Sequence, residues 1–345
     1  MGQMICHGAE ALPEIWEALR AKKLLLVCGA SFDRLPLHNA LIPRETETIR
    51  FSGFTSNPRY EDAQTGAEIF RGGNCDAILA VGGGSAIDVA KCIKLFSGTP
   101  APLVAVPTTA GTGSESTRHA VLYKDGVKQS ISDPSIVPDY AVLEPKLLQA
   151  LPLYQKKCTM LDALCQGIES WWSVNATNES MAFSKAAVEG VAANWRAYIG
   201  ENDAGAAARV MEAANASGRA IDITATTAPH AMSYKLTSLY GLPHGHAVAL
   251  CMGEVWPYLL AHTDACIDPR GRAHLERVLE AIEEVLSLDG YRAMLSELDL
   301  KCPAAQDKDA ELDMLARSVN PERLKNNPVA LTGNTLYAMY ERILQ

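Results

Sequence analysis

Short apolar runs alternate with stretches of helical periodicity over the first 150 residues. Buried strands are predicted at 24–27, 46–51, 77–81 and 103–106, with an amphipathic helix before the first strand and further helices near 60–71 and 86–96. Such alternation is typical of a parallel sheet covered by helices. Polar and β-branched residues between Val121 and Leu143, around Asp125-Gly126, predict a hairpin or a loop excursion from this layer.

From about Leu151 onward the periodicity is helical. Good helix formers with helix-length spacing occupy 157–174, 180–199, 206–226, 247–260 and 273–288. We therefore expect an α/β domain over 1–150 and an all-α domain over 151–345. No linker rich in Gly, Ser or Pro separates them, so a cleft between two contacting domains is the expected ligand site.

The composition is that of an ordinary folded protein, and it narrows the choice of partners. Of 345 residues, 48% are hydrophobic and 21% charged, and a domain size of about 150 residues agrees with two domains. The net charge is −9 without a Lys/Arg-rich run, which argues against nucleic acid as a partner. A small anionic substrate is still compatible with the negative net charge, because a pocket needs only a few suitably placed cations to bind it.

The apolar runs are too short for a membrane span, which needs roughly 18 residues. The first residues lack the basic region and apolar segment of a secretory signal. Nine cysteines without a C-x-x-C pair are typical of reduced thiols rather than of a disulfide framework. We therefore expect a cytoplasmic protein with no membrane partner.

Two loops that follow predicted strands carry the residues expected of a nucleotide site. Gly82-Gly83-Gly84-Ser85 joins a strand to a helix, where a bare backbone and a helix amino terminus can approach a pyrophosphate. The segment 107–117 adds a dense set of hydroxyls and a pair of glycines after the next strand. Neither is the G-x-G-x-x-G fingerprint, and a tight turn and a capping loop would use the same residues. Together they favour a nucleotide.

Four polar residues of the second half form a candidate metal site. Asp162 and Gln166 stand four apart, so a helix would place both oxygens on one face. His230 and His244 flank Gly241, where one helix should end and another begin. The four could bind a divalent cation through two oxygens and two nitrogens, although each alone is more often a solvated or structural side chain.

The order and spacing of these motifs resemble the iron-containing (group III) alcohol dehydrogenases over about residues 10–260. The resemblance rests on Gly82–Ser85 with Asp88 and Lys91, on 107–115, on Asp162-Ala163-Leu164, and on His230 with Pro243-His244-Gly245. It implies a Rossmann-like dinucleotide-binding domain followed by an all-α domain, with NAD(P) and a divalent metal in the cleft between them. A dimer through the α/β domain is common in the family, so we also expect a homodimer.

The resemblance also implies roles for single residues. Gly83, Gly84 and Ser85 would hold the pyrophosphate, with Asn57, Thr108, Thr109 and Thr117 near the ribose and nicotinamide and Lys128 as a cofactor-contacting lysine. The metal ligands would be Asp162, Gln166, His230 and His244. The expected cation is Fe²⁺ or Zn²⁺. Most members have histidine where this chain has Gln166, and an amide oxygen is a weaker ligand than imidazole for late first-row metals, so the choice between the two stays open.

Three further positions bear on proton transfer and cofactor choice. Tyr234 replaces another histidine of many members and could hydrogen-bond the substrate oxygen or only fill the pocket, and His246 is an additional histidine. Both are candidates to deliver the proton. The first strand ends in Val27-Cys28-Gly29-Ala30-Ser31 without the aspartate that meets a ribose 2′-hydroxyl, so NADPH is favoured over NADH.

The expected reaction is metal-assisted hydride transfer between NAD(P)H and a small aldehyde. The segments 228–246 and 319–329 and the Gln166 variant resemble the phosphonoacetaldehyde reductase (2-hydroxyethylphosphonate dehydrogenase) branch. Arg118 and Lys235 are the cations expected to meet the phosphonate, unless they are solvated or paired with Glu115 and Asp222. Alternatives are another small aldehyde, a lyase similar to dehydroquinate synthase, and a non-catalytic nucleotide-binding relative.

Overall fold

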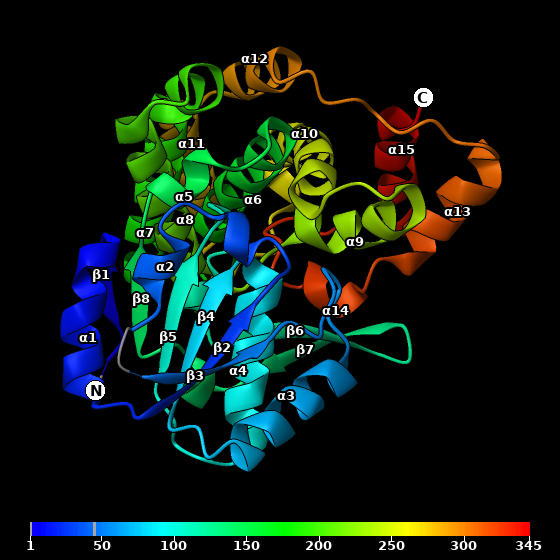
Figure 1. The fold of residues 1–345 in the computed structure, drawn as a ribbon. Coiled ribbons are helices and arrows are strands. Elements are labelled where there is room, and N and C mark those ends of the chain that lie inside the picture. Colours follow the sequence, from blue (N-terminus) through cyan, green and yellow to red (C-terminus); the bar gives the residue numbers. More distant parts are fainter. Residues whose placement is uncertain (1, 44–45) are drawn as a thin grey trace.

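The amino-terminal half is built on one six-stranded parallel sheet. In the computed structural model, which describes residues 2–43 and 46–345, the strand order is β1-β8-β5-β4-β2-β3. The strands are β1 (Met4–His7), β2 (Lys23–Cys28), β3 (Glu47–Phe51), β4 (Ala77–Gly82), β5 (Leu103–Pro107) and β8 (Tyr140–Leu143). The expected α/β architecture is therefore confirmed, and Figure 1 shows this half below the helical half.

Alternate residues of the central strands form two separate cores. On one face, Leu25, Val27 and Ile78 pack against α3 (Tyr60–Gly72) and α4 (Gly84–Ser97). On the other face, Leu24 and Leu26 pack against α1 (Leu12–Leu19). Since both faces are covered, the strands are apolar without interruption, as parallel sheets require. This explains why β2, β4 and β5 were visible in the sequence.

The predicted excursion after β5 is partly a hairpin and partly sheet. β6 (His119–Lys124) and β7 (Val127–Ser132) pair antiparallel around the Asp125-Gly126 turn, as expected. The same stretch ends, however, in β8, which pairs with both β5 and β1. Both β1 and β8 span only four residues, too short for a periodicity to be recognised, and the sequence did not predict them.

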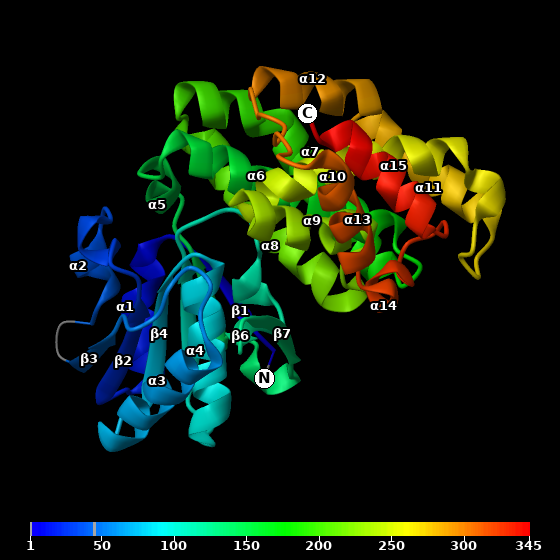
Figure 2. The same cartoon turned by 90° about the vertical axis from the view of Figure 1, so that its right-hand side faces the viewer.

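The carboxy-terminal half is helical, as expected (Figure 2). Its helices are α5 (Lys146–Gln149), α6 (Leu153–Trp172), α7 (Asn178–Arg196), α8 (Ala204–Thr224), α9 (Ala228–Tyr240), α10 (His244–Ala261), α11 (Arg272–Val285), α12 (Leu288–Glu297), α13 (Lys308–Ser318), α14 (Pro321–Leu324) and α15 (Gly333–Ile343). α6 lies in the centre of this half and is buried along most of its length. Among the described residues, no helix is both long and apolar enough to cross a bilayer.

The two halves touch through a backbone contact that only glycine permits. A Cβ on Gly113, in the loop after β5, would lie 2.4 Å from the Cα of Gly218 on α8. Gly113 also has φ +59°, in the left-handed region that glycine adopts without strain. This contact fixes the hydroxyl-rich loop against the helical half, so that both halves line one cleft.

Candidate active site

A cavity of about 580 Å³ lies between the carboxyl ends of β4 and β5 and the helices α6, α9 and α10. Its size is that of a typical ligand pocket. Most of the predicted site residues line it: Asn57, Gly83, Gly84, Ser85, Thr109, Thr117, Lys128, Asp162, Gln166, His230, Tyr234 and His244. Thr108 does not line it, because it is buried in the loop after β5, where its backbone N–H donates to the Gly82 carbonyl over 2.9 Å. The structure thus brings the nucleotide and metal motifs to one cavity.

The glycine turn forms a cradle at the amino terminus of α4. A Cβ on Gly84 would lie 2.8 Å from Oγ1 of Thr112, and one on Gly83 would lie 3.3 Å from Thr109. Ser85 Oγ donates to the Ser56 carbonyl over 2.6 Å, which ties the cradle to the loop carrying Asn57. The free N–H groups at the start of α4 can bind a pyrophosphate, and the glycines let it approach the backbone closely. The residues therefore fit a dinucleotide.

Buried charges of α4 hold the hydroxyl-rich loop in place. The Lys91 ammonium donates to Ser114 Oγ and Thr117 Oγ1, both over 3.0 Å, and to the His119 carbonyl over 2.8 Å. Asp88 accepts from Ser114 Oγ and, over 2.9 Å, from the Val121 N–H. Burial lowers the pKa of Lys91 to about 8, although the charge of Asp88 opposes this shift. Thr117 therefore accepts a hydrogen bond that holds the loop and also lines the cleft.

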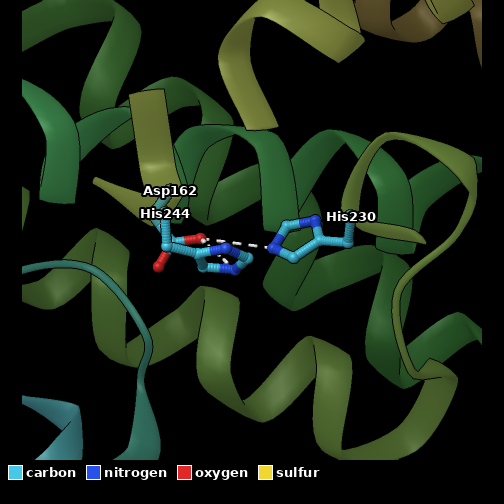
Figure 3. A group of neighbouring side chains, drawn as sticks. All are labelled: Asp162, His230 and His244. Atoms are coloured by element: carbon cyan, nitrogen blue, oxygen red, sulfur yellow. Dashed lines mark hydrogen bonds and ion pairs between the residues drawn. The ribbon is translucent and has the colours of Figure 1, made fainter. Parts of the chain in front are cut away.

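Asp162, His230 and His244 form a cluster able to hold a cation (Figure 3). One ligand atom from each lies within 4.8 Å of the others. His230 Nε2 lies 3.2 Å and His244 Nε2 lies 3.9 Å from Asp162 Oδ1. Burial lowers the pKa of His244 to about 3, which keeps its imidazole neutral, as a metal ligand must be. Two imidazoles and a carboxylate are donors that Fe²⁺ and Zn²⁺ accept.

Glu169, which the sequence analysis did not single out, orients His230. Its side chain is fully buried on α6, and its Oε2 accepts from His230 Nδ1. Its Oε1 accepts from the N–H groups of Thr227 and His230 over 3.0 and 3.2 Å. A carboxylate on one ring nitrogen directs the other nitrogen toward a metal. The signal was present: Glu169 follows Asp162 by seven residues and so shares its helical face.

Gln166 lies beside the cluster, with its amide nitrogen toward it. Nε2 donates to Asp162 Oδ1 over 3.4 Å, and Oε1 accepts from Ser217 Oγ over 3.0 Å. A half-turn of the amide would direct Oε1 to the cluster. The Ala214 carbonyl lies 2.8 Å from Ser217 Oγ and can take its single proton instead. Ser217 Oγ is then free to accept from the turned amide. Gln166 as a fourth ligand stays a prediction.

Gly245 allows His244 to reach the cluster. His244 is the first residue of α10, and a Cβ on Gly245 would lie 1.9 Å from the Cys158 carbonyl oxygen and 2.9 Å from Asp162 Cβ, both on α6. Real Cβ atoms do not approach so closely. Only glycine therefore lets α10 begin directly against the helix that carries Asp162.

Tyr234 lies between the cluster and two cations. Its ring stacks on that of His244, with centroids 5.8 Å apart and planes 6° from parallel. Lys128 Nζ lies 3.5 Å from the Tyr234 centroid, and Arg323 Nη1 donates to Tyr234 Oη over 3.1 Å. Burial, reinforced by the charge of Arg323, lowers the pKa of Lys128 to about 7. Arg323 lines the cleft, but it was not predicted from the sequence as a site residue.

Three predicted residues lie outside the cleft lining. His246 borders a different cavity of about 360 Å³ and shares a 2.8 Å hydrogen bond with Tyr154 Oη, because two helical residues turn it about 200° away from His244. Arg118 is held by Asp222 through contacts of 2.7 and 3.0 Å. Lys235 follows Tyr234 on α9 and is turned about 100° from it. The structure therefore does not place His246, Arg118 and Lys235 in the cleft lining, and their roles in proton delivery and substrate binding stay predictions.

Comparison with known proteins identifies the family. The iron-containing alcohol dehydrogenase model matches residues 3–145, and the C-terminal model of the Fe-containing alcohol dehydrogenase family matches residues 157–344. The chain belongs to the iron-containing alcohol dehydrogenase family, whose members are oxidoreductases. The expected family and enzyme class are thereby confirmed.

Individual relatives extend this result. The chain is 35% identical to a phosphonoacetaldehyde reductase of Streptomyces viridochromogenes, over 80% of this chain and 77% of that protein. It is 30% identical to a choline dehydrogenase of Bacillus subtilis, over 74% and 71%. Its fold matches a sulfoacetaldehyde reductase from Bifidobacterium kashiwanohense in complex with NAD⁺, with a TM-score of 0.85, 26% identity and coverage of 99% and 96%. A 1,3-propanediol oxidoreductase, at 24% identity and a TM-score of 0.86, shares the fold.

Proposed function

We propose that this protein is a metal-dependent reductase that uses NADPH or NADH to reduce phosphonoacetaldehyde to 2-hydroxyethylphosphonate. The observation that carries the proposal is the convergence, in one cavity, of the glycine cradle and the Asp162–His230–His244 cluster. The Streptomyces relative supports the choice of aldehyde. The B. kashiwanohense structure with NAD⁺ supports a nicotinamide dinucleotide.

Asp162, His230 and His244 would hold the cation, with Gln166 beside them, and Gly83, Gly84 and Ser85 would hold the pyrophosphate. When bound, the cation supplies Lewis-acid polarisation of a carbonyl oxygen and the reduced nicotinamide supplies a hydride. Glu169 keeps Nε2 of His230 directed at the cluster. Asp162, Gln166 and His230 are buried, and a low-dielectric setting strengthens electrostatic interactions with developing charge.

The alcohol oxygen needs a proton after hydride arrives, and Tyr234 is the predicted proton donor that the cleft contains. Its Oη accepts from Arg323 and keeps its own proton free to donate. Burial raises the pKa of the Tyr234 hydroxyl, so it is protonated at neutral pH. Water or a ribose hydroxyl are the other routes.

A reductase assay with the metal-loaded protein tests the proposal. NADPH or NADH oxidation is followed with phosphonoacetaldehyde, with an uncharged aldehyde such as propanal, and without aldehyde, and metal content is measured on the same sample. We expect stoichiometric cofactor oxidation and the highest kcat/KM for phosphonoacetaldehyde. A lyase similar to dehydroquinate synthase would show no net oxidation, and a non-catalytic relative would bind cofactor without turnover; either result would refute the proposal.

A further inference from the structure

Two cations of the cleft lie side by side without a carboxylate partner. Lys128 Nζ is 3.5 Å and Arg323 Cζ is 5.2 Å from the centroid of the same ring, that of Tyr234. Within residues 2–43 and 46–345, neither forms a salt bridge, whereas other buried or half-buried cations, such as Arg118 and Lys94, are paired with aspartates. Two like charges held together in a protected cleft favour the binding of an anion between or beside them.

Among the described residues, the donors of both groups are largely free. Arg323 makes one side-chain hydrogen bond there, to Tyr234 Oη, out of the five N–H groups that a guanidinium offers. Lys128 contacts the face of the Tyr234 ring. A guanidinium presents a planar fork that matches phosphoryl oxygens, and an ammonium adds a point charge.

The chain holds these groups in position from three separate elements. Lys128 comes from β7, Tyr234 from α9 and Arg323 from α14. α14 begins at Pro321 with Asn320 as its cap, whose Oδ1 accepts from the Glu322 N–H over 2.9 Å.

The segment after α14 is anchored to the helical half. Asn326 Nδ2 donates to the Thr226 carbonyl over 3.2 Å, and the Asn326 carbonyl accepts from the Val174 N–H over 3.1 Å. Arg323 is thus held by a tethered segment rather than a free tail.

The two cations and the metal cluster belong to one cavity. Tyr234 stacks on His244, and Lys128 and Arg323 both lie near the same Tyr234 ring. Lys128, Arg323 and the cluster residues line the same cavity of about 580 Å³. A small aldehyde with an anionic group can therefore meet the cations and the metal site within one cavity.

We propose that Arg323 and Lys128 form the receptor for a dianionic phosphonate head group and so determine which aldehyde is reduced. This inference rests on the proposed reductase function, replaces Arg118 and Lys235 as the substrate-binding cations, and assigns Lys128 to the substrate instead of the cofactor. A bound dianion favours the protonated form of Lys128. Two positive charges match a dianion better than the single negative charge of a sulfonate, so phosphonoacetaldehyde is selected over sulfoacetaldehyde and over neutral aldehydes.

The test is a selectivity measurement on R323Q, R323K and K128Q. Loss of one charge-assisted bond is expected to lower the ratio of kcat/KM for phosphonoacetaldehyde to that for propanal by about 10- to 100-fold, mainly through KM. We expect R323K to keep part of the wild-type ratio, because lysine retains the positive charge but lacks the planar guanidinium. The matched control is K325Q, two residues away in an exposed pair with Glu322, which keeps the wild-type ratio.

A direct measurement accompanies the kinetics. Calorimetric titration of the wild-type holoenzyme with 2-hydroxyethylphosphonate should show binding that R323Q weakens by a similar factor, while thermal melting shows that both proteins are folded. An unchanged ratio in both R323Q and K128Q, or equal losses for both aldehydes, overturns the receptor. A wild-type kcat/KM that is higher for sulfoacetaldehyde overturns the dianion assignment. Wild-type protein that reduces no aldehyde refutes the proposed function instead.

Discussion

Replacing Glu169 by glutamine tests whether the buried carboxylate prepares His230 for a metal. In the wild type, Oε2 accepts from His230 Nδ1, and the other ring nitrogen, Nε2, faces Asp162. A cation that binds there displaces the proton of Nε2 and takes its lone pair, while Nδ1 keeps its own proton, hydrogen-bonded to Glu169. The amide of E169Q keeps one oxygen for the Thr227 and His230 N–H groups, but presents an N–H₂ donor to Nδ1. His230 then places its proton on Nε2, where a cation needs the lone pair. We expect metal affinity to fall about 10- to 100-fold, equivalent to about 1.4–2.8 kcal/mol.

The assay is a chelator-competition titration with Zn²⁺, which avoids oxidation during the measurement. The matched control is E115Q, since Glu115 is likewise buried but bonds to Asn215 over 3.0 Å at the contact between the halves. We expect E115Q to bind Zn²⁺ as the wild type does. Equal affinities for E169Q and wild type, with both folded by thermal melting, would refute the role of Glu169.

Three further predictions concern the same cleft. G245A should lose bound metal and about 1–3 kcal/mol of unfolding free energy, because its Cβ would overlap the Cys158 carbonyl. The control in metal analysis and melting is G253A, where a Cβ meets no atom within 4 Å. A G245A protein that still binds its full complement of metal would contradict the packing argument. Y234F should lower kcat for aldehyde reduction while the metal content stays unchanged, if Oη delivers the proton, and an unchanged kcat would assign that proton to water or ribose. NADPH should give a higher kcat/KM than NADH, because Gly29 supplies no carboxylate after β2. The nearby Asp33 forms an ion pair with Arg50 over 2.8 Å and so does not repel a 2′-phosphate. A clear preference for NADH would refute this explanation of cofactor choice.

Much of the fold was predictable because its elements are long or wholly buried. Strands β2, β4 and β5 are continuous apolar runs, and α6 carries a helical pattern over 20 residues. The short strands β1 and β8 were missed because four residues define no period, and they gain their place by pairing with each other. Long-range pairing of this kind has no local signal.

The candidate site divides in the same way. The cradle follows from local spacing, since Gly83 and Gly84 start a helix. The shared helical face of Asp162 and Gln166 is local too, whereas His230 and His244 were candidates that the family resemblance supported. The cations proposed to bind the substrate could not be chosen by proximity in sequence. Arg118 lies next to a cleft loop but is neutralised by Asp222, whereas Arg323 lies far along the chain and is brought to Tyr234 by the packing of α14.

We propose that this cleft reduces an anionic aldehyde with the help of a metal, which a comparison of two samples can decide. The kcat/KM for phosphonoacetaldehyde is measured with Fe²⁺-loaded and metal-stripped protein under the same NADPH concentration. We expect rapid NADPH oxidation by the loaded protein and its near-complete loss after stripping. Equal rates in both samples, or no oxidation in either, would refute metal-dependent reduction.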